Sequence, residues 1–295
     1  MNIPDLFKTE YPFRSNFLDL DGLRYHYLDE GSGPPVLMVH GNPSWSFYYR
    51  NLVRELRSSH RCIVPDHIGC GLSDKPGDDR YEYTLSRRIS DLERLIDSLG
   101  ITEKITLVVH DWGGMIGMGW AARNPERVER LVILNTAAFP LPKSKPFPLA
   151  LRICRDTVIG TFLVRGFNAF ARGAASVGCK INPMPDPLRK IYCLPYFNWK
   201  NRIATLRFVQ DIPLKAGDKG YDIVESTAAS LEKFRHLPVL ILWGEQDFVF
   251  DRHFLEEWKR RFPEATVHSW QKGGHYILED VKDEAVPLIA EFIRR

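Results

Sequence analysis

The segment VVHDWGG, residues 108–114, places an aspartate where a β-branched run meets a pair of glycines. A buried carboxylate is costly to place unless hydrogen bonds compensate for the lost water. At this position Asp111 would end a strand and begin a helix, where free backbone N–H groups favour a negative charge. The same placement suits a plain N-cap of that helix. The pattern therefore leaves two roles for Asp111, a nucleophile and a helix cap.

An aspartate at a strand–turn–helix elbow implies different chemistry from the serine usually found there. Serine attack on a saturated carbon gives an ether, which water does not readily cleave. Aspartate attack on that carbon gives an ester, which water can cleave at its own carbonyl. Because a carboxylate is ionised at neutral pH, a histidine base is needed only for the second step. As a nucleophile, Asp111 therefore indicates alkylation at carbon or another reaction that a carboxylate can start.

Two further residues would complete such a site. His275 follows a glycine pair after the last predicted strand, and Asp247 follows the strand before it. The chain order is thus nucleophile, acid and base, as in α/β-hydrolases with a serine nucleophile. We expect His275 to be the base and Asp247 to hold its tautomer and stabilise the imidazolium. Glu245 and Asp251 are the competing acids.

Alternating strands and helices must position these residues. A hairpin is predicted at 17–31, and helices are predicted near 46–58, 84–99, 113–124, 251–261 and 281–294. Buried strands are predicted at 34–41, 61–67, 104–111, 128–136, 238–244 and 265–270. The alternation implies a mostly parallel α/β sheet with helices on both faces, and ligands bind beyond the carboxyl ends of such strands.

The alternation is interrupted between residues 139 and 230, a segment rich in proline and aromatic residues. We predict a helical cap at 139–230, inserted into an α/β core made of 1–138 and 231–295. The cap carries 14 Lys and Arg residues against 6 Asp and Glu residues. This excess predicts either an ordinary solvated face or a surface for an acidic partner, an anionic membrane surface or self-association.

The overall composition excludes several protein classes. With 44% hydrophobic and 26% charged residues, the chain is typical of a soluble globular protein. A net charge of +3 without a dense basic run argues against nucleic-acid binding. Five scattered cysteines, a polar N-terminus and no apolar run of membrane-spanning length predict a cytoplasmic protein. No phosphate-binding glycine loop or metal-ligand cluster is seen, so we expect no cofactor and no metal.

Together, the motifs resemble the haloalkane dehalogenase and epoxide hydrolase branch of the α/β-hydrolases. The resemblance spans nearly the whole chain, through LDEG, VLMVHGNPSWSFYYR, VPDHIGCGLSDKP, VVHDWGG, RLVILNTAAF, LWGEQD and GGHYILED. It implies the α/β-hydrolase fold, with Asp111 as nucleophile. In this family the acid lies three residues after the glycine that ends its strand, which favours Asp247.

The resemblance also implies a halide site. Dehalogenases carry an asparagine after HG and a tryptophan after the nucleophile, here Asn42 and Trp112. Their N–H donors would hold the departing halide, and their backbone N–H groups would form an oxyanion hole. Core packing is the alternative for Trp112. The main prediction is a haloalkane dehalogenase-type hydrolase, in which Asp111 attacks the carbon bearing a halide and His275 activates the water that cleaves the ester.

A second activity fits the same residues. Asn42 with a late aspartate resembles the third dehalogenase subgroup, which is similar to the β-lactone decarboxylases of long-chain olefin synthesis. NTAAF, LVRGFNAFARGA, NRIATLRFVQDIPL and FLEEWKRRFP look particularly like those lactone enzymes. A halogenated or a β-lactone substrate would each need an apolar pocket under the cap. Aromatic residues that could line it, with core packing as the alternative for each, are Phe139, Phe167, Phe170, Tyr192, Tyr196, Phe197 and Trp199.

Two other interpretations are weaker. Epoxide hydrolases of this branch use two cap tyrosines, and Tyr192, Tyr196 and Tyr221 are available, but Asn42 is not expected in them. A catalytically silent binding protein of this fold would be expected to lose a catalytic residue, and here none is lost.

Overall fold

A single eight-stranded sheet organises residues 3–295, the part of the chain that the computed structural model describes. Its strand order is β1-β2-β4-β3-β5-β6-β7-β8, with β1, β2 and β4 paired antiparallel and the remaining neighbours parallel. The strands are β1 (Asn16–Asp19), β2 (Arg24–Glu30), β3 (Pro35–Val39), β4 (Arg61–Pro65), β5 (Ile105–Asp111), β6 (Val128–Thr136), β7 (Val239–Gly244) and β8 (Thr266–Trp270). The predicted fold class is confirmed.

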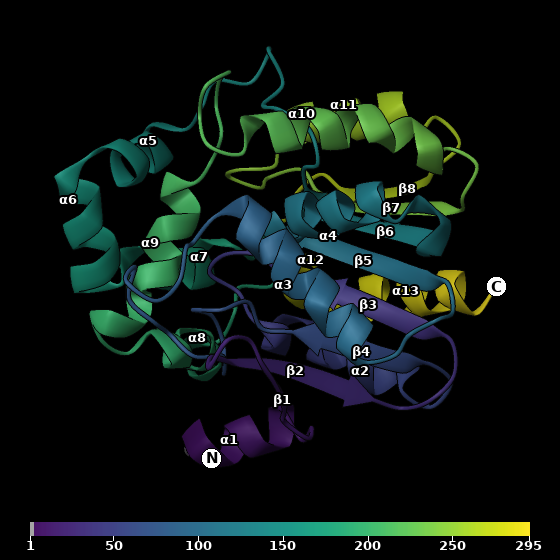
Figure 1. The fold of residues 1–295 in the computed structure, drawn as a ribbon, viewed down its shortest axis with the longest axis horizontal. Coiled ribbons are helices and arrows are strands. Elements are labelled where there is room, and N and C mark those ends of the chain that lie inside the picture. Colours follow the sequence, from purple (N-terminus) through teal and green to yellow (C-terminus); the bar gives the residue numbers. More distant parts are fainter. Residues whose placement is uncertain (1–2) are drawn as a thin grey trace.

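The central strands are continuous apolar runs because both faces of the sheet are covered. Along β3, Leu37 and Val39 pack into one apolar cluster, and Val36 and Met38 pack into the other. Helices on the first face are α3 (Leu85–Ser98), α4 (Trp112–Arg123) and α11 (Arg252–Arg261). Those on the second are α2 (Arg50–Leu56), α12 (Ile277–Asp280) and α13 (Lys282–Arg294). Figure 1 shows this three-layer arrangement.

The order of the strands creates a crevice at the centre of the sheet. From β3 the chain passes to β4 on one side, and it then returns to place β5 on the other side. Ligands bind at such a reversal, beyond the carboxyl ends of the strands. Asn42 follows β3 and Asp111 ends β5, so the two residues meet at this crevice.

A group of short helices lies beside the carboxyl ends of the strands (Figure 1). It comprises α5 (Leu149–Asp156), α6 (Val158–Thr161), a π-helical turn (Phe162–Gly166), α7 (Ala169–Val177), α8 (Asp186–Cys193) and α9 (Ile203–Gln210). The N-terminal α1 (Ile3–Glu10) contacts α8, whereas α10 (Tyr221–Ser230) packs against α4 of the core. The predicted division into 1–138 with 231–295 and 139–230 stays a prediction. Within residues 3–295, no helix has the length and apolar character needed to cross a bilayer.

Candidate active site

Asp111 occupies a strained elbow between β5 and α4. Its backbone has φ 53° and ψ −128°, a positive φ that is uncommon outside glycine. Such a conformation costs on the order of 1–3 kcal/mol and persists only where its surroundings enforce it. The Thr136 hydroxyl donates to the Asp111 carbonyl, and a Cβ at Gly113 would collide with the Val39 carbonyl. Close packing of α4 on β3 and β6 thus holds the elbow in place.

The two carboxylate oxygens of Asp111 have different surroundings. The backbone N–H of Asn42 donates to Oδ1 at 2.5 Å, and the backbone N–H of Trp112 also bonds this carboxylate. Oδ2 lies 3.8 Å from Nε2 of His275. Burial raises the pKa of Asp111, although His275 and the two N–H donors oppose that rise. The side chain therefore has one oxygen fixed in the predicted oxyanion hole and one free to react.

His275 lies between two carboxylates. Its Nδ1 is 2.7 Å from Oδ2 of Asp247, on the side of the ring opposite Asp111, and the residue is only 2% exposed. Burial alone would lower the pKa of His275, but Asp247 and Asp111 outweigh it and the pKa is raised. Three predicted residues are thus brought together, with the imidazole of His275 between the carboxylate that orients it and the carboxylate of Asp111.

The two competing acids are engaged elsewhere. Glu245 accepts a hydrogen bond from the Ser269 hydroxyl, and Asp251 pairs with Lys145 at 2.5 Å. Neither contacts His275, so Asp247 is the carboxylate that the structure offers to the imidazole.

Asn135 is a site residue whose role was not predicted from the sequence. At the end of β6, its Nδ2 donates to Oδ2 of Asp247 at 3.0 Å, and its Oδ1 accepts from the N–H of Gly244 at 2.8 Å. The N–H of Val249 donates to the other oxygen of Asp247 at 2.8 Å. These bonds fix the acid without neutralising it. The available signal was a polar side chain at the end of an otherwise apolar strand.

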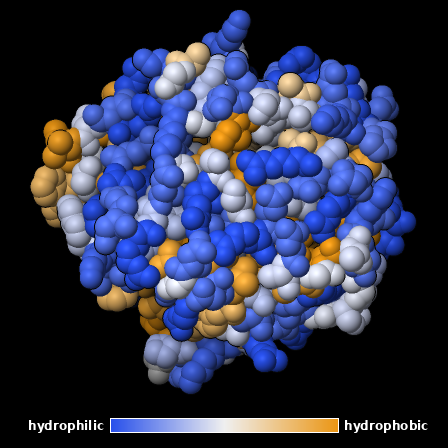
Figure 2. All heavy atoms as spheres, viewed as in Figure 1, coloured by the Kyte–Doolittle hydropathy of each residue, from blue (hydrophilic) through white to orange (hydrophobic). Residues whose placement is uncertain are grey.

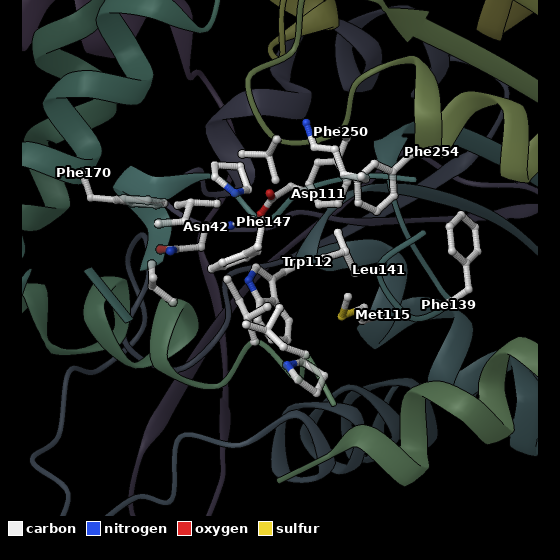
Figure 3. A pocket seen from close by; sticks show the side chains of 18 residues that line it. Asn42, Asp111, Trp112, Met115, Phe139, Leu141, Phe147, Phe170, Phe250 and Phe254 are labelled. Atoms are coloured by element: carbon white, nitrogen blue, oxygen red, sulfur yellow. Dashed lines mark hydrogen bonds between the residues drawn. The ribbon is translucent and has the colours of Figure 1, made fainter. Parts of the chain in front are cut away.

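Asn42 and Trp112 both face the cavity above Asp111 (Figure 3). The Asn42 amide donates from Nδ2 to the Thr205 carbonyl of α9 at 3.1 Å, which leaves its second N–H available. Within residues 3–295, the indole N–H of Trp112 has no hydrogen-bond acceptor. These two N–H groups could donate to a halide or an oxygen anion, and their role in halide binding stays a prediction.

The cavity itself is largely apolar and is lined by 18 residues. Besides Asp111, the only charged side chain is Lys145, which is paired with Asp251. In Figure 3, Asp111 lies centrally, Phe170 lies to one side, and Phe139 and Phe254 lie to the other. A carboxylate in an apolar enclosure suits a substrate that carries hydrocarbon on both sides of its reacting carbon.

Five of the seven predicted pocket residues lie elsewhere. Phe139 and Phe170 line the cavity, but Phe167, Phe197 and Trp199 point outward and are 70%, 69% and 41% exposed. The prediction was wrong for these three because an aromatic pattern in short helices does not reveal which face is inside.

The remaining two, Tyr192 and Tyr196, are buried where the cap meets the α/β core. The Tyr192 hydroxyl donates to Glu279 at 2.6 Å, and the Tyr196 hydroxyl donates to the Ser44 carbonyl at 3.4 Å. Both rings are packed in the core, so their assignment to the pocket was also wrong. Tyr221 does not line the cavity either, which leaves the epoxide hydrolase hypothesis without its two tyrosines.

Most of the cavity wall was not predicted. Met115 lies one turn after Asp111 on α4, and this spacing could have identified it. The other unpredicted residues come from loops, from cap helices and, for Phe254, from α11 of the core, and they are Leu141, Lys145, Phe147, Pro148, Leu151, Val209, Ile212, Pro213, Leu214, Val249, Phe250 and Phe254.

Comparison with known proteins places this geometry among related enzymes. Residues 34–154 and 182–281 match the α/β-hydrolase-fold family. A protein named cis-3-alkyl-4-alkyloxetan-2-one decarboxylase from Shewanella oneidensis is 62% identical, over 97% of this chain and 90% of its own length. A protein of the same name from Xanthomonas campestris pv. campestris is 49% identical, over 97% of both chains.

Haloalkane dehalogenases are more distant. Haloalkane dehalogenase 2 of Mycobacterium tuberculosis is 28% identical over 95% of both chains. The crystal structure of haloalkane dehalogenase DbeA from Bradyrhizobium elkani superposes with a TM-score of 0.84 at 26% identity, covering 96% of this chain and 98% of that one. The predicted resemblance to dehalogenases and β-lactone decarboxylases is confirmed, and of the relatives named here the lactone enzymes are the more similar.

Proposed function

Since the chain belongs to the α/β-hydrolase-fold family, we propose that it is a cis-3-alkyl-4-alkyloxetan-2-one decarboxylase, which converts a dialkyl β-lactone into an alkene and CO₂. The observation that carries this proposal is the Asp111 carboxylate, held on a strained elbow and opening into an apolar cavity. The two relatives named for this activity support it over carbon–halide cleavage. The α/β-hydrolase fold thus serves a reaction that need not consume water.

The first step forms an ester. Oδ2 of Asp111 attacks C4, the saturated ring carbon that bears the ring oxygen, and the C4–O bond breaks. The bonding pair moves to the ring oxygen, which becomes the carboxylate of the opened substrate. Oδ1 stays bound to the N–H of Asn42, so it takes the carbonyl position of the new ester. The raised pKa of His275 keeps an imidazolium beside the charge that develops.

The second step releases both products. The C2–C3 bond of the opened substrate breaks to give CO₂, and its electron pair forms the C3–C4 double bond. The bond from C4 to Asp111 breaks at the same time, which restores the carboxylate. All atoms and electrons balance without water, oxidant or cofactor. Water exclusion by the apolar cavity favours this route, because it keeps the ester from hydrolysing first.

Haloalkane dehalogenation is a second candidate, favoured by one observation. The indole N–H of Trp112 and one N–H of Asn42 face the cavity without an acceptor, as a halide cradle requires. In that reaction neutral His275 would activate water to cleave the alkyl ester.

A side-by-side assay separates the two activities. We expect the purified chain to release CO₂ and alkene from a cis-dialkyl β-lactone, and to release halide from 1-bromoalkanes far more slowly. The Asp111→Ala variant, measured in parallel, corrects for spontaneous decomposition of the lactone. Halide release that outpaces lactone turnover would reverse the assignment.

A further inference from the structure

The outside of the cap exposes an unusual number of apolar side chains. Six of them are between 41% and 72% exposed, and they come from α6, the π-helical turn and the loops flanking α7 and α8. These residues, which we term the outer cap surface, are Val158, Ile159, Phe162, Phe167, Phe197 and Trp199. Figure 2 shows an apolar patch at the left edge of the molecule, where Figure 1 places α6.

The outer cap surface is continuous across its two chain segments. The Phe162 and Trp199 rings lie 5.9 Å apart between centroids. The guanidinium of Arg202 donates to the carbonyl of Gly166 at 2.8 Å and to that of Phe197 at 3.0 Å. These bonds fasten the two segments together, so the exposed rings project from a fixed framework.

Positive charge without a matching carboxylate surrounds these rings. The Arg165 guanidinium lies 4.7 Å from the Trp199 ring centroid. Arg172 and Arg202 line a surface hollow between Phe167 and Phe197, and neither forms an ion pair within the part of the chain described.

The one carboxylate lining that hollow is engaged. Asp186 pairs with Lys190 at 2.7 Å and with Arg189 at 3.6 Å. Both guanidiniums of the hollow therefore keep a positive charge that no carboxylate balances. Arg202 already donates to four backbone carbonyls, so Arg172 is the one whose N–H groups are available to an external anion. Exposed rings beside unpaired guanidiniums match the boundary of a bilayer, where apolar groups enter the acyl region and cations meet phosphates.

We propose that the outer cap surface docks on an anionic lipid bilayer. Projecting side chains fit a fluid acyl boundary, whereas a protein partner would need a complementary groove. Phe162, Phe167 and Phe197 would enter the boundary. Arg172 would contact a lipid phosphate, and the positive charge of Arg202 would add to the attraction.

Docking would bring the catalytic cavity next to the membrane. The same group of cap helices lines the cavity from inside, through Leu151 of α5, Phe170 of α7 and Val209 of α9. A substrate with two alkyl chains could then pass between bilayer and cavity with little exposure to water. This delivery role rests on the proposed function, while docking itself does not.

Vesicle co-sedimentation of the full chain tests the docking. We expect binding to phosphatidylcholine vesicles that contain phosphatidylglycerol, and weaker binding to phosphatidylcholine alone. The variant Phe162→Ser/Phe167→Ser/Arg172→Glu should lower the binding constant at least about tenfold. The matched control, Phe17→Ser/Lys233→Glu, changes an exposed phenylalanine on β1 and an exposed lysine after α10, and it should bind like the unaltered chain.

Tryptophan fluorescence gives a second readout, which reports contact with the bilayer without a variant that binds more weakly. Trp199 is the most exposed of the seven tryptophans. Lipids brominated along their acyl chains should quench it, and Trp199→Phe should remove that quenching while vesicle binding persists. Soluble glycerophosphate should not compete at concentrations matching the lipid phosphate, since the apolar contacts need a bilayer.

Three results would overturn docking. The first is that the unaltered chain does not bind anionic vesicles. The second is that the triple variant and the control bind them equally. The third is that the unaltered chain is a dimer in the absence of vesicles and that the triple variant is a monomer. The last result would assign the surface to self-association. None of these assays uses the lactone, so Asp111→Ala should dock normally, and a failed lactone assay would leave the docking result intact.

Discussion

The elbow at β5 and the cap that covers it differ in what fixes their side chains. Asp111, His275 and Asp247 each follow or end a strand of one sheet, so backbone hydrogen bonds set their positions. Phe167 and Phe170 lie three residues apart at the start of a cap helix, yet one points to solvent and the other into the cavity. On the proposed function, the carboxyl ends of the strands therefore position the reacting groups, and the cap selects the substrate that reaches them.

The largest effect is expected at the elbow. Asp111→Asn keeps the size of the side chain but removes the nucleophile, so lactone turnover should fall at least about 10⁴-fold. Initial rates of CO₂ release measure this loss, and circular dichroism checks that the fold is kept. Retention of more than a tenth of the rate would show that the carboxylate does not bond to the substrate.

His275→Phe should separate the two candidate reactions. An ester made from a 1-bromoalkane needs the base for hydrolysis, so the alkylated enzyme should accumulate and be visible by intact-protein mass spectrometry. The lactone-derived ester breaks down through its own carboxylate, so no adduct should persist, although loss of the imidazolium should slow turnover about 10²–10³-fold. A stable lactone adduct would mean that His275 is needed for the second step as well.

Trp112→Phe tests the anion cradle. The change keeps an aromatic ring but removes the indole N–H, which has no acceptor in residues 3–295. Halide release from a bromoalkane should slow about 10²-fold, while lactone turnover should change less than about threefold. Equal losses on both substrates would assign the indole to general packing.

The pH dependence of the two reactions should run in opposite directions. Because the pKa of His275 is raised, its imidazolium persists above pH 6.5 and disappears as the pH rises through that raised value. Lactone turnover should fall over this range and bromoalkane hydrolysis should rise. Asp247→Asn removes a charge that raises the pKa of His275, so the pH at which each rate changes should move down by about one unit. If neither pH–rate profile moves, the titrating group is not His275.

The smallest effect is expected within the cap. Phe170→Ala enlarges the cavity and should change the ratio of the KM values for long-chain and short-chain lactones about three- to tenfold. Phe167→Ala is the matched control on the outside, and with detergent-dispersed lactone it should leave that ratio unchanged. The same change of the KM ratio in both variants would contradict the assignment of Phe170 to the cavity and Phe167 to the outer surface.

Sequence alone could predict the core site and only part of the cap. Strand ends are readable from apolar runs, and ends of parallel strands meet at one edge, which brought Asp111, Asp247 and His275 together. Asn135 was visible at the end of its strand, but its bonds to Asp247 depend on how β6 and β7 pair. Phe167 and Phe170 lie on either side of Asn168, whose left-handed backbone (φ 54°) interrupts the helix, and no local pattern announces that break.

Single turnover in H₂¹⁸O tests the central claim most directly. If the Asp111 ester breaks down through loss of CO₂, alkene and CO₂ should form in equal amounts, and peptide mass spectrometry should find no ¹⁸O in the Asp111 carboxylate. Incorporation of ¹⁸O into Asp111, with a hydroxy acid as product, would contradict the account, because water would then be the agent that cleaves the ester.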